Sequence, residues 1–566
     1  MGRNVAIGIQ DFETLIQKGY FYIDKTDFIR EWWDSGDAVT LIARPRRFGK
    51  TLNMSMLEQF FSLKYAGRSD LFEGLSIWEH EEYRSIQGTY PVLFLSFANV
   101  KETTYEAAKY KICQVLESIY IQNYFLVDSG VLTEKDKEYF DRVSAGMYEG
   151  DATVALNRLC EYLYRYYGKK VIILLDEYDT PMQEAYVNGF WDELVAFTRS
   201  MFNAAFKTNL YLERAVMTGI TRVSKESIFS DLNNLEVVTT SSDKYETVFG
   251  FTEQEVFQAL EEMELGTEKE KVKSWYDGFR FGNQKDIYNP WSVINYLDKH
   301  RLGVYWANSS SNRLVNKLIR EGDREVKLIF EDLMYGGSYR TEIDEQIVYN
   351  QLTTNHEAIW SLLLASGYLK ATDIEFEEYS GKFYYSLELT NKEVRIMFAG
   401  MMRDWFAAYN SGYKSFLKSF LQGDLEAMNA YMNRITLATF SYFDTGAHPG
   451  KQSEPEKFYH GFVLGLMVSL EESYIVTSNR ESGFGRYDVM IEPRDKTKPA
   501  ILVEFKVHNP KKEKNLEETV TAALKQIEEK AYESVLLERG FLKSQIRKYG
   551  FAFEGKNVLI GGDDFQ

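Results

Sequence analysis

Four short, continuous apolar runs in the N-terminal part restrict the fold of this chain more than any other feature. They span residues 38–43, 91–97, 171–175 and 215–217, and amphipathic patterns of helical period separate them. Strands that are apolar on both faces are typical of parallel sheets covered by helices on both sides, whereas strands with one wet face alternate. We therefore expect an α/β domain with a parallel sheet at the N-terminus.

The length of the chain predicts several domains. The chain has 566 residues, whereas a single hydrophobic core stops growing at roughly 250 to 300 residues. After the sheet domain, at 1–245, we expect a helical lid or accessory region at 246–320 and a mostly helical middle region at 321–445 that contains a hairpin. A turn-rich segment that begins near Gly446 then introduces a C-terminal α/β domain at 446–566.

Composition and charge exclude some classes of protein. Apolar residues make up 45% of the chain and charged residues 27%, which are ordinary globular values. The formal net charge of -18 disfavours broad nonspecific binding to nucleic acid, so any such site must be locally basic. No window approaches about 18 consecutive apolar residues and the N-terminus lacks a signal-peptide pattern, so we expect a soluble, cytoplasmic protein without membrane contact.

A phosphate-binding loop is predicted directly after the first apolar run. Residues 44–51, Arg-Pro-Arg-Arg-Phe-Gly-Lys-Thr, lie between that run and a helical pattern at 52–61, which is the strand, loop and helix order of a P-loop. Lys50 would reach the outer phosphates of ATP and Thr51 would bind Mg²⁺, while the rest of the loop wraps the phosphates. The residues predicted to bind the nucleotide here are Arg46, Arg47, Phe48, Gly49, Lys50 and Thr51. The general pattern has a glycine where this chain has Arg44, so the loop alone is a degenerate motif.

Two acids at the end of the third apolar run complete the predicted ATP site. Asp176 would hold the magnesium shell and Glu177 would polarise the attacking water. Charged residues at the carboxyl ends of parallel strands lie where open α/β sheets bind ligands. Thr218, at the end of the fourth run, would lie between these acids and the γ-phosphate, and Arg222 would stabilise developing charge. An ordinary turn after the strand remains the alternative for Thr218 and Arg222.

These motifs resemble the bacterial AAA-ATPase-like family. The resemblance rests on residues 20–25, 44–51, 175–179 and 218–224, and also on 275–278, 288–291 and 306–308, so that it covers roughly residues 4–310. The family usually has the arginine-rich loop without its first glycine. The resemblance therefore implies ATP binding in spite of Arg44.

A second group of charged residues lies near the C-terminus. Residues 487–492 and 500–507 are predicted to form neighbouring strands, and they bring Asp488, Glu504 and Lys506 into one region. Residues two apart on a strand share a face, so Glu504 and Lys506 project together while Phe505 packs on the other side. Asp488 and Glu504 could hold Mg²⁺ and Lys506 could stabilise charge or position the nucleophile. An amphipathic hairpin whose charged face is merely wet is the alternative.

The surroundings of these strands resemble the PD-(D/E)XK nuclease superfamily. The resemblance rests on residues 456–462, on the turn at 478–488 and on a helix with Gln526, Ile527 and Tyr532. It implies that Asp488 and Glu504 are metal ligands, that Lys506 is the catalytic lysine, and that Glu456 is an additional acid of the metal site. His460 would share a helix face with Glu456 and could contact substrate, with a histidine of the core as the alternative, and Gln526 would lie on the following helix.

Together the motifs predict an ATP-binding and ATP-hydrolysing P-loop domain coupled to a Mg²⁺-dependent nuclease-like domain. The predicted cofactors are ATP and Mg²⁺, and the predicted partner of the C-terminal domain is DNA or RNA; a homo-oligomer or a protein partner stays open. The alternative is a non-catalytic, ATP-dependent interaction or regulatory module whose nuclease-like fold is a platform. The middle region at 321–445, to which no chemistry is assigned, motivates that alternative.

Overall fold

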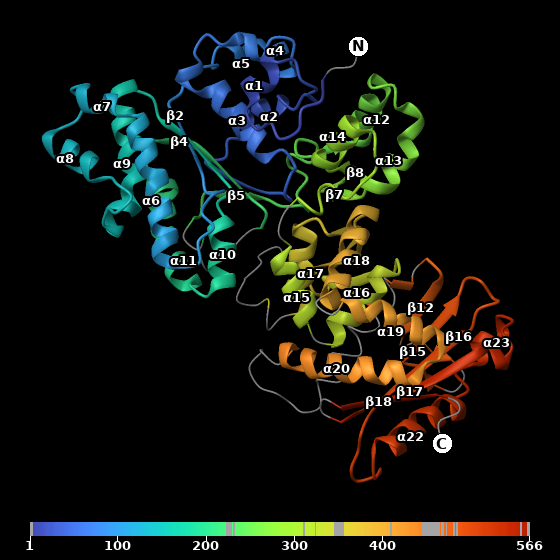
Figure 1. Cartoon of the computed structure of the whole chain (residues 1–566). Coiled ribbons are helices and arrows are strands. Elements are labelled where there is room, and N and C mark those ends of the chain that lie inside the picture. Colours follow the sequence, from blue (N-terminus) through green and yellow to red (C-terminus); the bar gives the residue numbers. More distant parts are fainter. Residues whose placement is uncertain are drawn as a thin grey trace. The chain divides into compact units, whose positions relative to one another are not determined.

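The structure is a computed structural model of the whole chain (Figure 1). It describes residues 4–221, 229, 232–309, 312–322, 324–344, 352, 356–407, 410–443, 465, 469–470, 472–478, 481–482, 485–554 and 557–562. The chain divides into two compact units. The first contains Met1–Leu314 and Gly336–Arg395, and the second contains Val315–Tyr335 and Ile396–Gln566. The finer division into four regions stays a prediction.

A five-stranded parallel sheet forms the centre of the first unit, as the apolar runs predict. Its order is β2-β3-β4-β1-β5. The strands are β1 (Val39–Ala43), β2 (Val92–Ser96), β3 (Val171–Asp176), β4 (Leu212–Gly219) and β5 (Leu235–Val238). Every residue of β1 and β3 is buried, as expected of strands covered on both faces. The predicted fold class is confirmed for this part of the chain.

Helices connect and surround these strands. They are α1 (Phe12–Gln17), α2 (Asp27–Ser35), α3 (Lys50–Phe61), α4 (Ser76–Glu79), α5 (Glu81–Arg84), α6 (Tyr105–Gln122), α7 (Phe125–Asp128), α8 (Glu134–Arg142), α9 (Glu149–Tyr167), α10 (Thr180–Asn188) and α11 (Trp191–Phe202). The helix α3 begins directly after Gly49, whose φ of 80° lies in the left-handed region that glycine adopts without strain. The chain therefore passes from β1 through a tight loop into a helix, as a P-loop requires.

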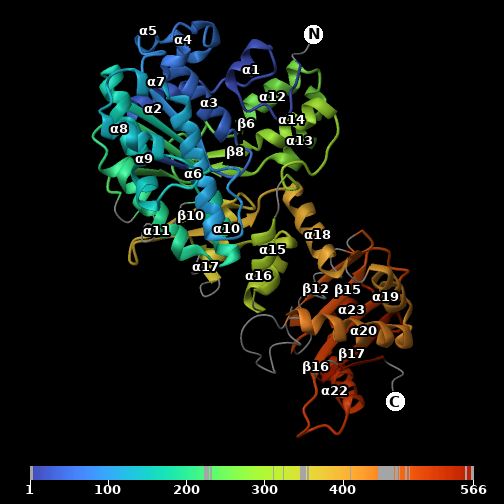
Figure 2. The same ribbon diagram turned by 60° about the vertical axis from the view of Figure 1, so that its left-hand side comes forward.

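An accessory subdomain follows the sheet. It contains β6 (Phe251–Thr252), α12 (Glu253–Glu262), α13 (Lys269–Tyr276), β7 (Phe279–Phe281), β8 (Gln284–Tyr288) and α14 (Pro290–Lys299). Figure 2 shows α12, α13 and α14 grouped around β8, and the three strands form a small sheet of order β6-β8-β7. Val256, Leu260, Tyr276 and Tyr288 pack together in its core. The region predicted to be helical therefore contains a small sheet as well as helices.

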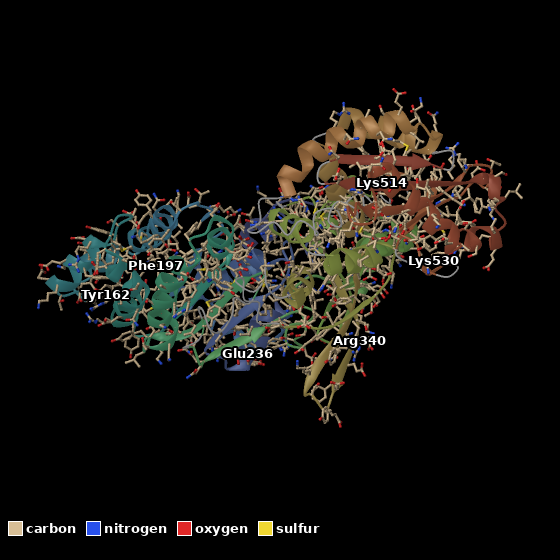
Figure 3. The ribbon with its side chains drawn as sticks, turned by 90° about the horizontal axis from the view of Figure 1, so that it is seen from below. Tyr162, Phe197, Glu236, Arg340, Lys514 and Lys530 are labelled. Atoms are coloured by element: carbon tan, nitrogen blue, oxygen red, sulfur yellow. The ribbon has the colours of Figure 1, made fainter. Side chains whose placement is uncertain are left out.

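The first unit ends with a second small sheet. It has the order β10-β11-β9 and is antiparallel throughout. Its strands are β9 (Tyr339–Glu342), β10 (Leu369–Glu377) and β11 (Lys382–Leu389), and α17 (His356–Ala365) precedes the hairpin. Figure 3 labels Arg340 on β9; its guanidinium lies 4.2 Å from the centre of the Tyr384 ring. The hairpin expected in the middle region is present.

The second unit is built around a mixed sheet of order β12-β15-β16-β17-β18. Its β16–β17 pair is parallel and its other pairs are antiparallel. The strands are β12 (Tyr474–Ser478), β15 (Val489–Pro493), β16 (Ala500–Val507), β17 (Ile546–Glu554) and β18 (Asn557–Gly562), beside a separate pair β13 (Glu481–Ser482) and β14 (Gly485–Arg486). The helices are α16 (Arg324–Met334), α19 (Asn410–Gln422), α20 (Leu425–Phe443), α22 (Leu516–Glu529) and α23 (Ser534–Glu538), and α15 (Arg313–Glu321) and α18 (Lys392–Ala407) connect it to the first unit. The predicted C-terminal α/β fold is confirmed.

One helix differs from its prediction. The sequence predicts one helix that contains Gln526, Ile527 and Tyr532, but the structure has two helices, α22 and α23, with a break between Glu529 and Ser534. Ala531 has a φ of 51°, and the Tyr532 N–H donates to the Ile527 carbonyl across this turn. Tyr532 is buried by the turn, as part of the core around Met490 and Leu502.

Among the described residues, no helix is long and apolar enough to cross a membrane.

Candidate functional site

The loop between β1 and α3 has the local geometry of a phosphate-binding loop. Gly49 and Arg47 both have positive φ, of 80° and 64°, and no side chain of the described residues caps the N-terminus of α3. Lys50 is buried and its Nζ donates to the carbonyl oxygens of Arg44 and Pro45, at 2.8 Å each. Burial lowers the pKa of Lys50 to about 8. The uncapped helix N-terminus and this buried cation fit the phosphates of a nucleotide.

The predicted magnesium ligands of this site meet at the carboxyl ends of β3 and β4. Asp176 is 1% exposed. The hydroxyl of Thr51 donates to Asp176 Oδ2 at 2.8 Å, and the hydroxyl of Thr218 donates to Asp176 Oδ1. Burial raises the pKa of Asp176. One carboxylate and a hydroxyl, both hard oxygen ligands, are therefore in contact where a magnesium ion would bind.

Glu177 follows at the same edge of the sheet. Its φ is 51°, its N–H donates to Thr218 Oγ1 at 3.2 Å, and its carboxylate accepts from Thr180 Oγ1 at 3.0 Å. The structure thus brings Thr51, Asp176, Glu177 and Thr218 together. Their roles toward ATP stay predictions, and Arg222 lies outside the described residues.

Arg44 has a structural role that the sequence pattern does not reveal. Its buried guanidinium donates to the carbonyl oxygens of Thr239 and Lys244 and lies 4.5 Å from the centre of the Phe281 ring. The side chain therefore connects the start of the loop to the residues after β5 and to β7.

The other loop residues also contact groups far away in the sequence. Arg46 Nη2 donates to Gln183 Oε1 at 2.9 Å, and the Arg47 guanidinium lies 4.5 Å from the centre of the Trp291 ring. Phe48 is buried against Phe279 and Phe281, with ring centres 4.8 and 5.3 Å away. Since the Phe48 side chain is an anchor in the accessory subdomain, its backbone is the part available to a phosphate.

Two side chains to which the sequence analysis assigned no role donate hydrogen bonds to a carbonyl group of this loop. The Arg46 carbonyl accepts from Trp306 Nε1 at 2.9 Å and from Asn289 Nδ2 at 3.4 Å. Both belong to motifs on which the family resemblance rests, so that resemblance was the available signal, although it assigned them no role.

The predicted nuclease-like residues meet on one face of the mixed sheet. Asp488 Oδ2 accepts from the Phe505 N–H at 2.7 Å. Gln526, on α22, donates through Nε2 to Glu504 Oε1 and accepts through Oε1 from Lys506 Nζ at 2.7 Å. The Phe505 ring lies on the other face, with its centre 5.0 Å from that of Phe551. The alternating arrangement predicted for 504–506 is confirmed.

Burial makes the charge of Glu504 costly. Glu504 is 3% exposed, and burial, followed by the charge of Asp488, raises its pKa to about 9. Among the described residues no donor reaches Glu504 Oε2. A buried carboxylate oxygen without a hydrogen bond, close to a second carboxylate, fits a divalent cation with oxygen ligands.

Two further predicted residues cannot be placed at this site. Glu456 and His460 lie outside the described residues, as does nearly all of the helix expected to carry them. Gln526 is therefore the member of the predicted additional set that the structure places, and it contacts both Glu504 and Lys506.

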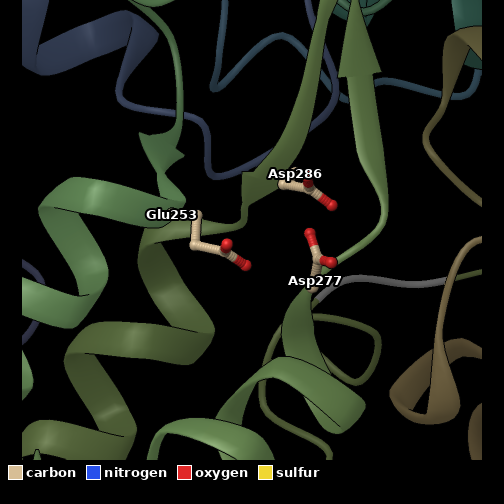
Figure 4. Close-up of side chains that lie close together, drawn as sticks. All are labelled: Glu253, Asp277 and Asp286. Carbon is tan, nitrogen blue, oxygen red and sulfur yellow. The ribbon is translucent and has the colours of Figure 1, made fainter.

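A third group of acids lies in the accessory subdomain. Glu253, Asp277 and Asp286 offer oxygen atoms within 4.8 Å of one another (Figure 4). Burial and the neighbouring Asp286 raise the pKa of Asp277 to about 7. The ammonium group of Lys273 contacts Glu253 and lies 3.8 Å from Asp286 Oδ1, and the hydroxyl of Tyr288 donates to Glu253 at 3.1 Å. Because the cluster already contains a lysine cation, we assign no metal to it.

Comparisons with known proteins agree with the two resemblances. Residues 6–229 match the family model described as Predicted AAA-ATPase, and residues 454–562 match that of the PD-(D/E)XK nuclease superfamily. The chain is also similar to a protein of Azotobacter chroococcum mcd 1 described as "Uncharacterized protein in vnfD 5'region". The two are 24% identical over 553 residues, which is 95% of this chain and 94% of that protein.

Proposed function

We propose that the first unit binds ATP with magnesium and hydrolyses it, and that the second unit is a magnesium-dependent nuclease acting on DNA or RNA. The observation that carries the ATP site is the contact of Thr51, Asp176 and Thr218 at the end of a phosphate-binding loop. The family match at 6–229 supports it. The match at 454–562, with Glu504, Lys506 and Gln526 in contact, supports the nuclease.

In the first unit some residues bind the phosphates and magnesium, and others orient the attacking water. The N–H groups at the start of α3 bind phosphate oxygens, and Lys50 neutralises charge on the outer phosphates. Thr51 and Asp176 would hold magnesium, which would neutralise negative charge that develops on the phosphates. Glu177 orients the attacking water, with its backbone fixed by Thr218.

In the second unit Asp488 and Glu504 would hold magnesium, which polarises the phosphodiester and lowers the pKa of a bound water. Lys506 stabilises negative charge that develops on the phosphate, and Gln526 fixes its ammonium group beside Glu504. Lys511, Lys512 and Lys514 are exposed directly after β16, and Figure 3 labels Lys514 and Lys530 on this unit. Such lysines supply the local positive charge that a polyanion needs.

The test uses the full chain. The parent protein is expected to hydrolyse ATP and to nick nucleic acid with magnesium, in a screen of single- and double-stranded DNA and RNA. Lys50→Ala should abolish the first activity and leave the second site intact, whereas Glu504→Ala and Lys506→Ala should abolish nicking and spare ATP hydrolysis. Nicking that persists in both second-unit variants would mean that the cleavage comes from another protein or another site.

The second candidate is a non-catalytic, ATP-dependent interaction or regulatory module whose nuclease-like fold is a platform. The middle region at 321–445, to which no chemistry is assigned, motivates this candidate. Magnesium binding to the full chain, measured by calorimetry in the parent protein and in Glu504→Gln, separates the two candidates. Binding that is lost in Glu504→Gln supports the nuclease, and binding that is absent or the same in both proteins supports the platform.

A further inference from the structure

The carbonyl side of the nucleotide loop is held by the accessory subdomain. In a loop whose N–H groups face a phosphate, carbonyl groups point the other way. The Arg46 carbonyl accepts hydrogen bonds from Trp306 Nε1 at 2.9 Å and from Asn289 Nδ2 at 3.4 Å. A shift of the loop on nucleotide binding would therefore change the contacts of these two side chains.

Trp306 is itself held on two sides. Its ring is 3% exposed and lies against Phe279 and Tyr368, with ring centres 5.3 and 5.6 Å away. Its backbone N–H donates to Glu393 Oε1 at 2.6 Å. The indole N–H contacts the nucleotide loop and the backbone N–H of the same residue contacts Glu393, so Trp306 joins the two directly.

Glu393 is a buried carboxylate whose donors in this network are neutral groups. It is 1% exposed. The Ala307 N–H donates to Oε1 at 3.3 Å, and the Ser292 hydroxyl donates to Oε2 at 2.7 Å. Moving these donors away from the buried carboxylate would raise its free energy, because no water replaces the lost hydrogen bonds. The position of Glu393 is therefore sensitive to movement of the segment around Trp306.

Glu393 lies in the first turn of α18, which starts at Lys392 and runs to Ala407. Residues up to Arg395 belong to the first unit, and those from Ile396 belong to the second. A helix is stiff along its axis because each turn is hydrogen-bonded to the next. A displacement of its first turn is therefore passed along the helix.

We propose that Trp306 and Glu393 position the nucleotide loop from its carbonyl side, and that they couple nucleotide occupancy at the loop to α18. The proposal rests on the proposed ATP binding. It makes both side chains positioning residues, which act through the Arg46 carbonyl and touch no phosphate. The coupling predicts that nucleotide changes the backbone dynamics of α18, and that loss of the Trp306–Arg46 contact weakens nucleotide binding.

Two substitutions break the connection at different points. Trp306→Phe keeps a ring between Phe279 and Tyr368 and removes the indole N–H. Glu393→Gln keeps the side-chain length and removes the charge. Trp360→Phe is the matched control, since Trp360 is fully buried in α17 and no described residue accepts a hydrogen bond from its Nε1. The control loses the same volume as Trp306→Phe without losing that hydrogen bond.

The experiment measures nucleotide affinity and hydrogen exchange on the full chain, with magnesium and a non-hydrolysable ATP analogue as the probe. In the parent protein the probe should slow amide exchange in residues 396–407. Trp306→Phe should bind the probe about three- to tenfold more weakly, the effect of one lost hydrogen bond. Both Trp306→Phe and Glu393→Gln should lose the exchange response of α18, while Trp360→Phe behaves like the parent protein at a similar melting temperature.

Four results would overturn the proposal. Parent protein that binds the probe without any change in α18 has no such coupling. If α18 still responds to the probe in both variants, Trp306 and Glu393 do not carry the coupling. If Trp360→Phe changes affinity and exchange as much as Trp306→Phe does, the effect comes from general loss of packing. Parent protein that fails to bind the probe at all refutes the ATP site first, and the coupling with it.

Discussion

Replacing Arg44 by glycine would restore the general phosphate-loop pattern, yet we expect the variant to be less stable than the parent protein. The buried guanidinium donates to the carbonyl oxygens of Thr239 and Lys244 and lies 4.5 Å from the centre of the Phe281 ring. Each hydrogen bond from a charged donor contributes about 1.5–3 kcal/mol, and a desolvated cation–π contact contributes about 2 kcal/mol. Desolvation of the cation offsets part of this sum, so the expected loss is about 3–5 kcal/mol in the unfolding free energy of the first unit.

Urea unfolding followed by tryptophan fluorescence measures this loss. Of the nine tryptophans, only Trp405 belongs to the second unit, so the signal reports mainly on the first unit, and a lower midpoint at an unchanged slope indicates a loss of stability. Arg47→Gly is the matched control in the same loop. Arg47 is exposed over Trp291 and has a φ of 64°, which glycine adopts without strain, so its change should stay within about 1 kcal/mol.

An Arg44→Gly variant that unfolds within about 1 kcal/mol of the parent protein would refute a stabilising role of the buried guanidinium. Equally tight ATP binding by the variant and the parent would also refute this role, because an unanchored loop start should weaken phosphate binding. A large loss in Arg47→Gly would indicate that the loop tolerates no glycine for reasons unrelated to the buried guanidinium.

Three further predictions concern the buried carboxyl of Glu504 and two glycines whose surroundings leave no room for a Cβ. The pKa of Glu504 is raised to about 9 in the folded protein, above the value of about 4.5 expected for the unfolded chain. Without divalent cations the second unit should therefore lose stability as pH rises between these values, by at most about 1.4 kcal/mol per pH unit. In urea unfolding with a chelator, Glu504→Gln should remove this pH dependence, whereas the exposed control Glu529→Gln should keep it. Gly219→Ala places a Cβ 2.6 Å from the Tyr178 ring and 2.9 Å from Asp179, so it should displace the turn after Thr218 and lower kcat for ATP hydrolysis by about tenfold or more; unchanged kcat would refute this. Gly278→Ala places a Cβ 2.1 Å from the Thr390 carbonyl at a φ of 117°, so it should destabilise the first unit by at least about 3 kcal/mol, whereas Gly74→Ala, which meets no atom within 4 Å, should cost less in the same assay.

The parts of the fold that could be predicted from sequence are those set by local pattern. The run at 171–175 predicted a strand buried on both faces, and β3 is that strand. The two-residue period of β16 placed Glu504 and Lys506 on one face and Phe505 on the other, because side chains alternate along any strand. The acids at strand ends were predictable for the same reason, since the direction of parallel strands fixes which edge they reach.

The parts that could not be predicted depend on contacts between distant residues. Arg44 reaches partners 195 and 200 positions away, and Trp306 reaches the Arg46 carbonyl across 260 positions. No local pattern encodes such pairs. The break between α22 and α23 was missed for a related reason: it occurs at Ala531, without glycine or proline, because burial of Tyr532 outweighs the helix propensity of the segment.

Both candidate sites place a buried acid where its charge is only partly compensated. Asp176 accepts from the hydroxyls of Thr51 and Thr218, whereas Glu504 accepts from the Gln526 amide at one oxygen. Burial raises the pKa of both acids, so each folded unit binds a proton more tightly than the unfolded chain does. A divalent cation at the same oxygens competes with that proton and supplies the missing charge. Since the unfolded chain has no such paired oxygens, magnesium should stabilise both units, and the less compensated Glu504 site should gain more from it.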